Sequence, residues 1–416
     1  MHRRVVVFLT AEAISSIGSF ATMVVIWGYA AYHFHATPGE VSLYGLSFSI
    51  PGVVLGPIAG TVVDKLGPKP TLAASKIVGI VASLLLLTAN DFVTMALLAA
   101  LHGVASTFAH PAVQSMPPRL VDDSRLARTN ALVSLTDEIS IVVGPAVAGA
   151  AIALVGFRGA FVVDALTYAL GLVVLPMVHL RAVAGGEDGE APAFHWKDAL
   201  EGWRIVLRNR TARRVVLCTA TVFLLYGMSL LAEPLYVRDT LHRSENVFAA
   251  LQTAFGCCLV GGGLVAARLG DRLASFRFVA VGVAGSGLAA MLYLGTPHVP
   301  IAFTGVAVWG IFTAAISGPS RTVLQRSTPE RAHGRVMAAD MLAGNTTMLV
   351  GTVLAGPLIA HVGVPRTVVG VGAVAFVVGV VLFVRSAASE RGERSGRVGG
   401  PVEDGLPVLH DDPIDA

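Results

Sequence analysis

Long apolar runs without a charged side chain recur along the chain, separated by short polar segments. Residues 41–63 and 246–267 form two such runs, and residues 278–320 contain no Lys, Arg, Asp or Glu. Because about 20 apolar residues span a bilayer as a helix, the third run predicts two spans, joined by a turn at 296–300. The same pattern predicts twelve spans in all, at 5–32, 41–63, 71–89, 92–116, 130–155, 160–180, 215–236, 246–267, 274–295, 299–319, 335–361 and 367–385.

The composition argues against a soluble protein. Of the 416 residues, 54% are hydrophobic and 14% are charged, and the mean hydropathy is +0.71. A soluble chain of this length needs a charged surface that so few charged residues do not provide. Cys218, Cys257 and Cys258 lie inside hydrophobic runs, so we expect no disulfide framework, no metal site and no cofactor. We predict an all-α membrane protein.

The basic residues predict the orientation of the spans. Of the 30 Lys and Arg, 26 fall at the two ends, in the loops on the side of the termini, or in the long middle segment. Cytoplasmic loops carry the excess of Lys and Arg, so both termini are predicted to be cytoplasmic, in a multi-pass protein of a bacterial plasma or inner membrane. Cations spread over alternate loops also argue against a nucleic-acid partner. We expect no Lys or Arg inside a span, which argues against a tightly bound anionic substrate.

A charged middle segment divides the chain. We expect an N-terminal six-helix bundle over 1–180, a cytoplasmic linker over 181–213, a C-terminal six-helix bundle over 214–385 and a disordered cytoplasmic tail over 386–416. In the linker, apolar residues recur every three or four positions between charged ones, which predicts an amphipathic helix on the inner leaflet. Those apolar residues are Trp196, Leu200, Trp203 and Leu207.

The two predicted bundles share a weak internal similarity. Gly60 matches Gly263 at an offset of 203 residues, and Gly149 matches Gly356 at an offset of 207. Repeated six-helix units indicate a transporter with its binding site between the halves. The alternative is a chance similarity between Gly- and Ala-rich helices.

The loop after the second span carries a specific motif. Residues 60–69 have the sequence GTVVDKLGPK, which resembles the Gly-x-x-x-Asp-Arg/Lys-x-Gly-x-Lys/Arg signature of the major facilitator superfamily. Glycine at Gly60 permits a close helix crossing, and at Gly67 it permits a tight turn. The resemblance implies two pseudo-repeated bundles around a central site, the major facilitator fold.

Charged residues near the cytoplasmic ends of the spans are candidates for a latch. Asp64 and Lys65 lie in the motif, and Asp64 is predicted to meet Arg119 in one conformation only. Further in, charged residues of spans 5 and 11 predict an inner gate of ion pairs, or else static bridges to cytoplasmic arginines. These residues are Asp137, Glu138, Arg335 and Asp340.

A second motif narrows the resemblance. Gly144-Pro145-Ala-Val-Ala-Gly149 in span 5 resembles the Gly-Pro-x-x-Gly-Gly signature of drug:proton antiporters. Small residues permit close packing, and proline allows the helix to bend. Longer stretches, such as 118–132 and 325–337, are similar to the exporter branch that includes enterobactin and macrolide efflux proteins. Ala99 stands where drug antiporters commonly carry an arginine, which weakens the case for proton coupling.

Acidic residues inside spans require a structural or functional explanation, because inserting each one into the membrane costs about 2.5–3.5 kcal/mol on insertion scales. Glu12 lies in span 1, which the resemblance places at the central cavity, and is predicted to take and release a proton. The alternative is a carboxylate that reaches back to water or pairs with an N-terminal arginine. Glu233 in span 7 binds a cation, carries a proton, or sits at the membrane interface. Asp164 is explained by a local interaction at the start of its span, close after Arg158.

Two histidines and two tryptophans are further candidates. His102 and His110 are eight residues apart in span 4, hence on nearly one face, and could relay protons. The alternative is that each donates to a carbonyl. Trp27 and Trp309 could stack on a flat substrate, although packing explains them equally well.

Three classes of function compete on these residues. The first is a secondary transporter that exports a lipophilic or amphiphilic small molecule by proton antiport, as in multidrug resistance. The second is an uptake or facilitated-diffusion carrier of a small neutral solute. The third is a membrane receptor or enzyme, against which the chain shows no nucleophile–base pair and no metal-ligand cluster. We expect a monomer whose partners are the small-molecule substrate, protons as coupling ion, and membrane lipid.

Overall fold

The computed structural model describes residues 3–178, 180, 196–269, 273–329 and 332–397, and every regular element in these ranges is a helix. In chain order they are α1 (Arg3–His33), α2 (Pro38–Leu66), α3 (Pro68–Leu85), η1 (Leu86–Thr88), α4 (Phe92–Gln114), α5 (Pro117–Leu120), α6 (Asp123–Val174), η2 (Leu175–Met177), α7 (Trp196–Arg208), α8 (Arg210–Leu235), η3 (Tyr236–Thr240), α9 (Glu245–Leu269), α10 (Phe276–Leu294), α11 (Val299–Arg326), α12 (His333–Val362) and α13 (Val364–Arg397).

The helices agree with the hydrophobic runs. Ten helices in the described ranges are long and apolar enough to cross a membrane, or eleven if the two parts of α2, bent by 60° around residue 57, count as one span. The predicted spans 130–155 and 160–180 merge into α6, which is interrupted only at Gly156 with φ 70°. Twelve spans are therefore consistent with these helices, and the number stays a prediction.

Local chemistry defines where several helices begin and end. Thr37 caps α2 in a capping box, in which Glu40 bonds back to the Thr37 backbone. Asp91 caps α4 by accepting from the Thr94 amide, and its bonds with Thr94 lower the pKa of this carboxyl. Between α2 and α3 the chain turns through Gly67 at φ 89°, a conformation that glycine adopts without strain. The turn predicted at Gly67 is present.

Equivalent close contacts relate the two halves of the structure. In the N-terminal half, a Cβ on Gly103 of α4 would collide with the Phe48 carbonyl of α2. In the C-terminal half, Gly310 of α11 lies in the same way against the Phe255 carbonyl of α9. Both residues of the second contact lie 207 positions after those of the first, and 207 is the offset that relates Gly149 to Gly356 in the sequence. The fold is thus an all-α membrane fold of two pseudo-repeated bundles.

The halves meet through a pair of contacts related by the same offset. Gly149 of α6 lies against the Ala249 carbonyl of α9, and Gly356 of α12 lies against Ser42 of α2. Each glycine comes from one half and its partner from the other. Because a side chain at either position would overlap its neighbour, these small residues set how closely the halves approach.

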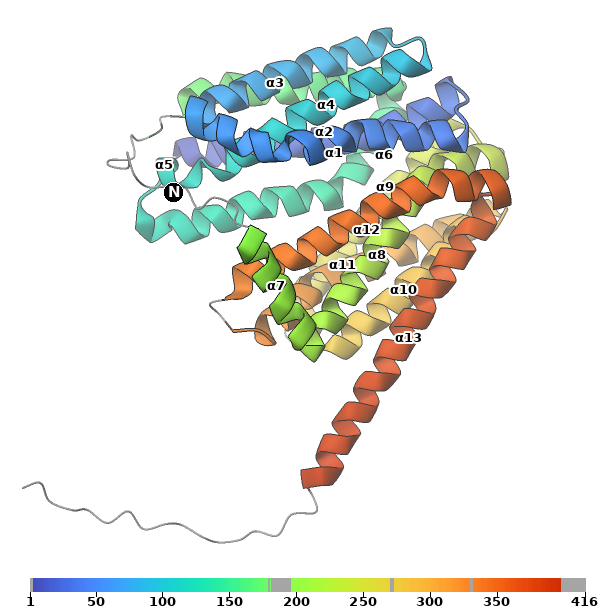
Figure 1. Ribbon diagram of the computed structural model, residues 1–416. Helices are drawn as coiled ribbons and strands as arrows, with labels where there is room; N and C mark the ends of the chain where they lie inside the picture. The colour runs from blue at the N-terminus through green and yellow to red at the C-terminus, as the bar shows by residue number, and fades with distance from the viewer. Residues whose placement is uncertain (1–2, 179, 181–195, 270–272, 330–331, 398–416) are drawn as a thin grey trace, which may run out of the picture.

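Within the described residues, core packing joins the two halves at one end of the bundle. The largest core cluster contains buried residues of both halves, such as Phe161 and Phe248, and lies toward the far end, where α1 ends. At the terminus end, where α1 begins, the core around Phe8 lies in the N-terminal half and the core around Val336 in the C-terminal half. The two sets of helices converge toward the far end and spread apart toward the terminus end (Figure 1).

Two helices extend beyond the bundles. The amphipathic helix predicted in the linker is α7, whose Val206 is buried in the core of the C-terminal half, with Gly202 close against the Arg335 backbone of α12. The last helix, α13, runs on to Arg397 and projects away from the bundle (Figure 1). Helix therefore covers residues 386–397, which the sequence pattern places in a disordered tail, and residues 398–416 lie outside the described part.

We expect Gly149→Val to weaken the joint between the halves, because the added side chain would overlap the Ala249 carbonyl and Thr253. Overpacking costs about 1–3 kcal/mol, so thermal unfolding in detergent should occur at a lower temperature than in the unmodified protein. Gly370→Val on α13 is the matched control, since no atom lies within 4 Å of its added Cβ. Equal melting temperatures for the two variants would contradict the close contact.

Candidate functional site

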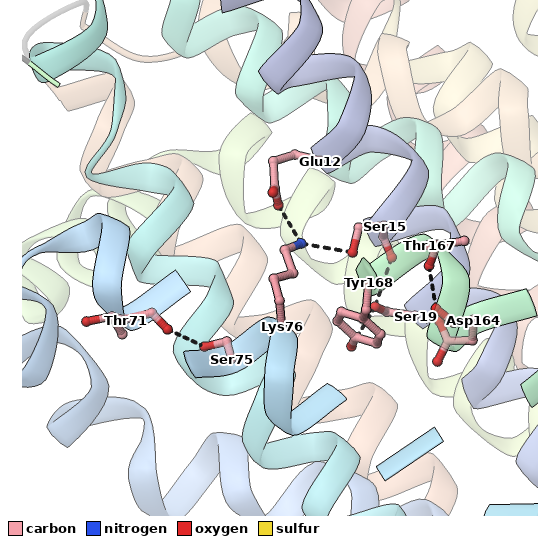
Figure 2. A network of polar contacts seen from close by, with 9 residues as sticks. All are labelled: Glu12, Ser15, Ser19, Thr71, Ser75, Lys76, Asp164, Thr167 and Tyr168. Carbon is pink, nitrogen blue, oxygen red and sulfur yellow. Dashed lines mark hydrogen bonds and ion pairs between the residues drawn. The ribbon is translucent and has the colours of Figure 1, made fainter. Parts of the chain in front are cut away.

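A buried ion pair lies inside the N-terminal half, between α1 and α3. Lys76 Nζ is 2.8 Å from Glu12 Oε2 and donates a second bond of 2.8 Å to Ser15 Oγ (Figure 2). Each charged side chain is 3% exposed. An isolated charge would be very costly here, whereas the pair is neutral overall and its ammonium is hydrogen-bonded on two sides.

The helices supply the space and the polar partners for this pair. Glu12, Ser15 and Ser19 follow one another at helical spacing on one face of α1. A Cβ on Gly171 of α6 would be 3.1 Å from Lys76 Cε, so the glycine leaves room for the lysine stem. The Lys76 ammonium also lies 5.6 Å from the ring centre of Tyr168, whose hydroxyl accepts from Ser19 at 2.9 Å. A continuous polar layer therefore connects α1, α3 and α6.

A second buried group lies farther along the same half. Asp164 Oδ2 on α6 accepts from Ser83 Oγ on α3 at 2.6 Å and lies 2.9 Å from His102 Nε2 on α4. Asp164 Oδ1 and His102 Nδ1 have no hydrogen-bond partner. Oδ2 therefore takes both hydrogen bonds, while the second carboxylate oxygen and the second ring nitrogen are left unmatched.

The structure changes how several predicted residues are understood. Glu12 is buried in its span as predicted, but its partner is Lys76 rather than water. The burial of Lys76 was not predicted, because the positive-inside comparison places every Lys and Arg in a loop or at an end, on one side of the membrane or the other. The expectation of no Lys or Arg inside a span is wrong, since α3 carries Lys76 within the candidate span Pro68–Thr88. The argument against anionic substrates therefore does not hold.

The local explanation of Asp164 is also wrong, because its partners are His102 and Ser83 from two other helices. Sequence spacing has no signal for such a contact between distant helices. The two histidines of α4 differ in environment: His102 is fully buried and His110 is exposed. A relay that uses both histidines stays a prediction.

The aromatic candidates lie in the core in this conformation. Trp27 is 4% exposed and packs beside Gly45, and Trp309 is 1% exposed, with its ring edge-on to Phe255 and Tyr293. These contacts favour the packing explanation.

Glu233 of α8 is buried, 6% exposed, near Tyr226 and Tyr293. Its side chain lies inside the C-terminal half, two residues before the end of α8, and a position at the membrane interface stays a prediction. Binding of a cation or a proton by Glu233 stays a prediction.

The latch candidates lie at the terminus end, where the halves are apart. Asp64 and Lys65 are exposed and Arg119 is half-buried, and no ion pair joins Asp64 to Arg119 in the described part of the chain. Asp340 lies beside Thr219 of α8 and Arg321 of α11.

The remaining gate and packing candidates are placed as follows. Arg335 is exposed at the start of α12, and the side chains of Asp137 and Glu138 lie outside the described residues. A Cβ on Gly60 would meet no atom within 4 Å, so no close crossing occurs there in this conformation. Gly144 packs against the Phe20 ring, next to the buried Pro145.

The far end is closed by contacts between the halves. Arg238 Nη1 of η3 donates to the carbonyls of Ala31 and Ala36 at 2.6 and 3.0 Å. The Tyr32 hydroxyl donates to the Arg243 carbonyl at 3.4 Å, and the Tyr32 ring centre is 6.2 Å from that of Phe248. Hydrogen bonds from one guanidinium to two carbonyls, at and just beyond the end of α1, therefore help to hold the halves together at the far end.

Comparisons with known proteins agree with this geometry. The family model of the Major Facilitator Superfamily matches residues 8–231 and 215–410. The uncharacterized MFS-type transporter YfiS of Bacillus subtilis is 22% identical over 92% of this chain and 93% of its own length. The multidrug efflux pump Tap of Mycobacterium tuberculosis is 25% identical over 79% of this chain and 81% of its own length.

The solved structures show the same fold. A bacterial homolog of the human lysosomal transporter Spinster, crystallised in an inward-facing and unoccupied conformation, has a TM-score of 0.67 at 15% identity. The match covers 93% of this chain and 96% of the homolog. A POT family transporter in complex with a thioalcohol-conjugated peptide also has a TM-score of 0.67, at 14% identity, and covers 93% and 96% of the two chains.

We expect Lys76→Met to destabilise the protein by about 3–5 kcal/mol, because it leaves the Glu12 carboxylate buried without a partner. The double variant Glu12→Gln with Lys76→Met removes both charges and should recover most of that loss. Chemical or thermal unfolding in detergent measures both effects. Lys65→Met, at an exposed lysine, is the control and should change little. A double variant no more stable than Lys76→Met would refute the pairing.

Proposed function

The chain belongs to the major facilitator superfamily, and on that premise we propose that it exports a small lipophilic or amphiphilic molecule by alternating access, coupled to proton antiport. The observation that supports this most is the buried Glu12–Lys76 pair, a carboxylate inside the membrane span whose charge depends on one movable partner. Relatives named multidrug efflux pumps and the resemblance of residues 144–149 to the antiporter signature support the outward direction.

Alternating access is supported by the joint at the far end. Arg238 and Tyr32 hold the halves together there, while the two separate cores leave the halves apart at the terminus end. With both termini in the cytoplasm, this is the inward-facing state. In the opposite state the Arg238–carbonyl bonds break, and the terminus end closes over the latch residues Asp64 and Arg119.

Proton coupling follows from the charge balance of the ion pair. Adding a proton to Glu12 while Lys76 stays in place would leave one uncompensated charge in the bundle, which is costly. Protonation and separation of the two side chains therefore occur together. Separation loosens α1 from α3, since Lys76 also holds Ser15 of α1. Proton uptake thus changes how these helices pack, which biases the equilibrium between the two states.

A second candidate on the same scaffold is an uptake or facilitated-diffusion carrier. Ala99, at the position of the antiporter arginine, is the observation that favours it. The superfamily consists of transporters rather than enzymes, which argues against a catalytic role.

Everted vesicles test the coupling. We expect addition of a lipophilic dye such as ethidium to dissipate an imposed pH gradient in vesicles that contain the unmodified protein. The double variant Glu12→Gln with Lys76→Gln keeps a neutral, hydrogen-bonded pair and should let the dye equilibrate without moving protons. Continued proton movement in the double variant would remove Glu12 from the mechanism, and dye equilibration without proton movement in the unmodified protein would favour the uncoupled carrier.

A cross-link tests alternating access at the far end. In a variant without Cys218, Cys257 and Cys258, cysteines at Tyr32 and Phe248 lie in opposite halves, with native ring centres 6.2 Å apart. Joining them with a short bifunctional thiol reagent should stop transport, and reduction should restore it.

The matched control joins Tyr32 to Phe157, whose ring centres are 6.1 Å apart within one half. This cross-link should leave transport active. Transport that continues with the first cross-link in place would show that the far end need not open.

A further inference from the structure

The joint at the far end lies on the axis that relates the two halves. The offset of 207 residues places Ala31 of α1 and Arg238 of η3 at equivalent positions, and Arg238 Nη1 donates to the Ala31 carbonyl at 2.6 Å. A contact between equivalent residues lies on the pseudo-two-fold axis itself. In transporters built from parallel repeats this axis runs along the membrane normal, and the substrate site lies at the interface of the repeats. The joint therefore closes the far end on the line of the transport path.

The two spans that meet at the joint end in the same backbone turn. The Ala36 amide donates to the Ala30 carbonyl at 3.1 Å, and 207 positions later the Arg243 amide donates to the Val237 carbonyl at 2.9 Å. The residue before each amide is a histidine with φ 50°. This turn has the form of the Schellman motif, which satisfies only some of the last carbonyls of a helix, so the others need donors from elsewhere.

Each half supplies such donors to the other half. Arg238 Nη1 donates to the carbonyls of Ala31 and Ala36, so a cation of the C-terminal half caps the end of α1, where the helix dipole is negative. In return, the Tyr32 hydroxyl donates to the carbonyl of Arg243, the residue equivalent to Ala36. These bonds can form only while the far ends of the two halves are together.

Asp239 fixes the direction in which the Arg238 guanidinium points. Arg238 Nε lies 2.6 Å from Asp239 Oδ1 and Nη2 lies 2.8 Å from Oδ2, which makes a bidentate pair along one edge of the guanidinium. Because the guanidinium is planar and rigid, fixing that edge leaves Nη1 to donate to the α1 carbonyls. The Arg238 side chain is 18% exposed, so its charge is partly desolvated at the joint and needs the carboxylate there.

The backbone turn does not require this charged pair. The N-terminal half makes the same turn with Ala31 and Tyr32 at the positions of Arg238 and Asp239. The last turn of span 7, η3, is wound as a π-helix, whereas the equivalent residues of α1 are α-helical. Single π-helical turns occur frequently at functional sites. A charged pair on the axis that only one repeat carries therefore points to a role in the movement of the halves rather than in folding.

We infer that Asp239 is a positioning residue for alternating access. By holding the Arg238 guanidinium toward the α1 carbonyls, it favours the closed far end and sets the equilibrium between the inward-facing and outward-facing states. The pair belongs to one half and moves with it, so the guanidinium stays preorganised when the joint opens, which lowers the cost of closing it again. The inference rests on the proposed alternating access and adds the residue that sets its balance.

The distance between two spin labels measures this equilibrium. In the cysteine-free variant, labels at Gly39 and Asn246 occupy equivalent, exposed positions at the far ends of the two halves. Double electron–electron resonance in nanodiscs gives the ratio of long to short separations, which correspond to an open and a closed far end. We expect short separations to dominate. Asp239→Asn should raise the ratio by about two- to fivefold, the effect of one partly exposed ion pair.

A double-variant cycle tests whether Asp239 acts through Arg238. Arg238→Gln alone should raise the ratio at least as much as Asp239→Asn does, and Asp239→Asn added to Arg238→Gln should change it little further. Asp91→Asn is the matched control, at another exposed carboxylate of the far end that remains a helix cap. It should leave the ratio unchanged.

Three results would overturn the inference. An unchanged ratio in Asp239→Asn would remove the positioning role. An equal rise with and without Arg238 would show that Asp239 acts by another route. Long separations as the main state of the unmodified protein would show that the joint does not close the far end. A shifted ratio without dye movement in everted vesicles would reject the proposed export alone, and dye export with an unchanged ratio would reject the role of Asp239 alone.

Discussion

A charge inside a membrane span is stable only when an opposite charge and hydrogen bonds are supplied with it, and this requirement organises the N-terminal half. Lys76 meets it by reaching across from α3 to Glu12 and Ser15 of α1. Neither charged group can move or change its ionisation without affecting the other. In the proposed mechanism, protonation of Glu12 would therefore change how α1 packs against α3.

The two halves use one backbone plan with different interiors. Their glycine contacts and positive-φ glycines recur at a single offset, which shows a common frame. Within that frame the N-terminal half carries the polar layer through α1, α3, α4 and α6. The equivalent region of the C-terminal half holds Trp309, whose ring lies edge-on to those of Phe255 and Tyr293.

Hydropathy and motifs were sufficient to predict the helices, the superfamily and the turn at Gly67, because these depend on local sequence. Contacts between distant helices were not predictable in the same way. The partner of Asp164 lies 62 residues away in sequence, and that of Glu12 lies 64 residues away. Lys76 lies within the predicted span 71–89 and was nevertheless counted with the loop cations, so its burial was overlooked. The contacts that close the far end join residues of opposite halves, such as Arg238 and Ala31, which periodicity does not encode.

The connections at Gly156 and Gly363 are very short, so few loops protrude from the face opposite the termini. A single residue reverses the chain at each, and the other connections on that face, at 34–37, 89–91, 241–244 and 295–298, have at most four residues. This face therefore offers only short loops as epitopes for an antibody fragment. Binders that stabilise the molecule for electron microscopy are better selected against the opposite face, where the end of α13 projects from the bundle.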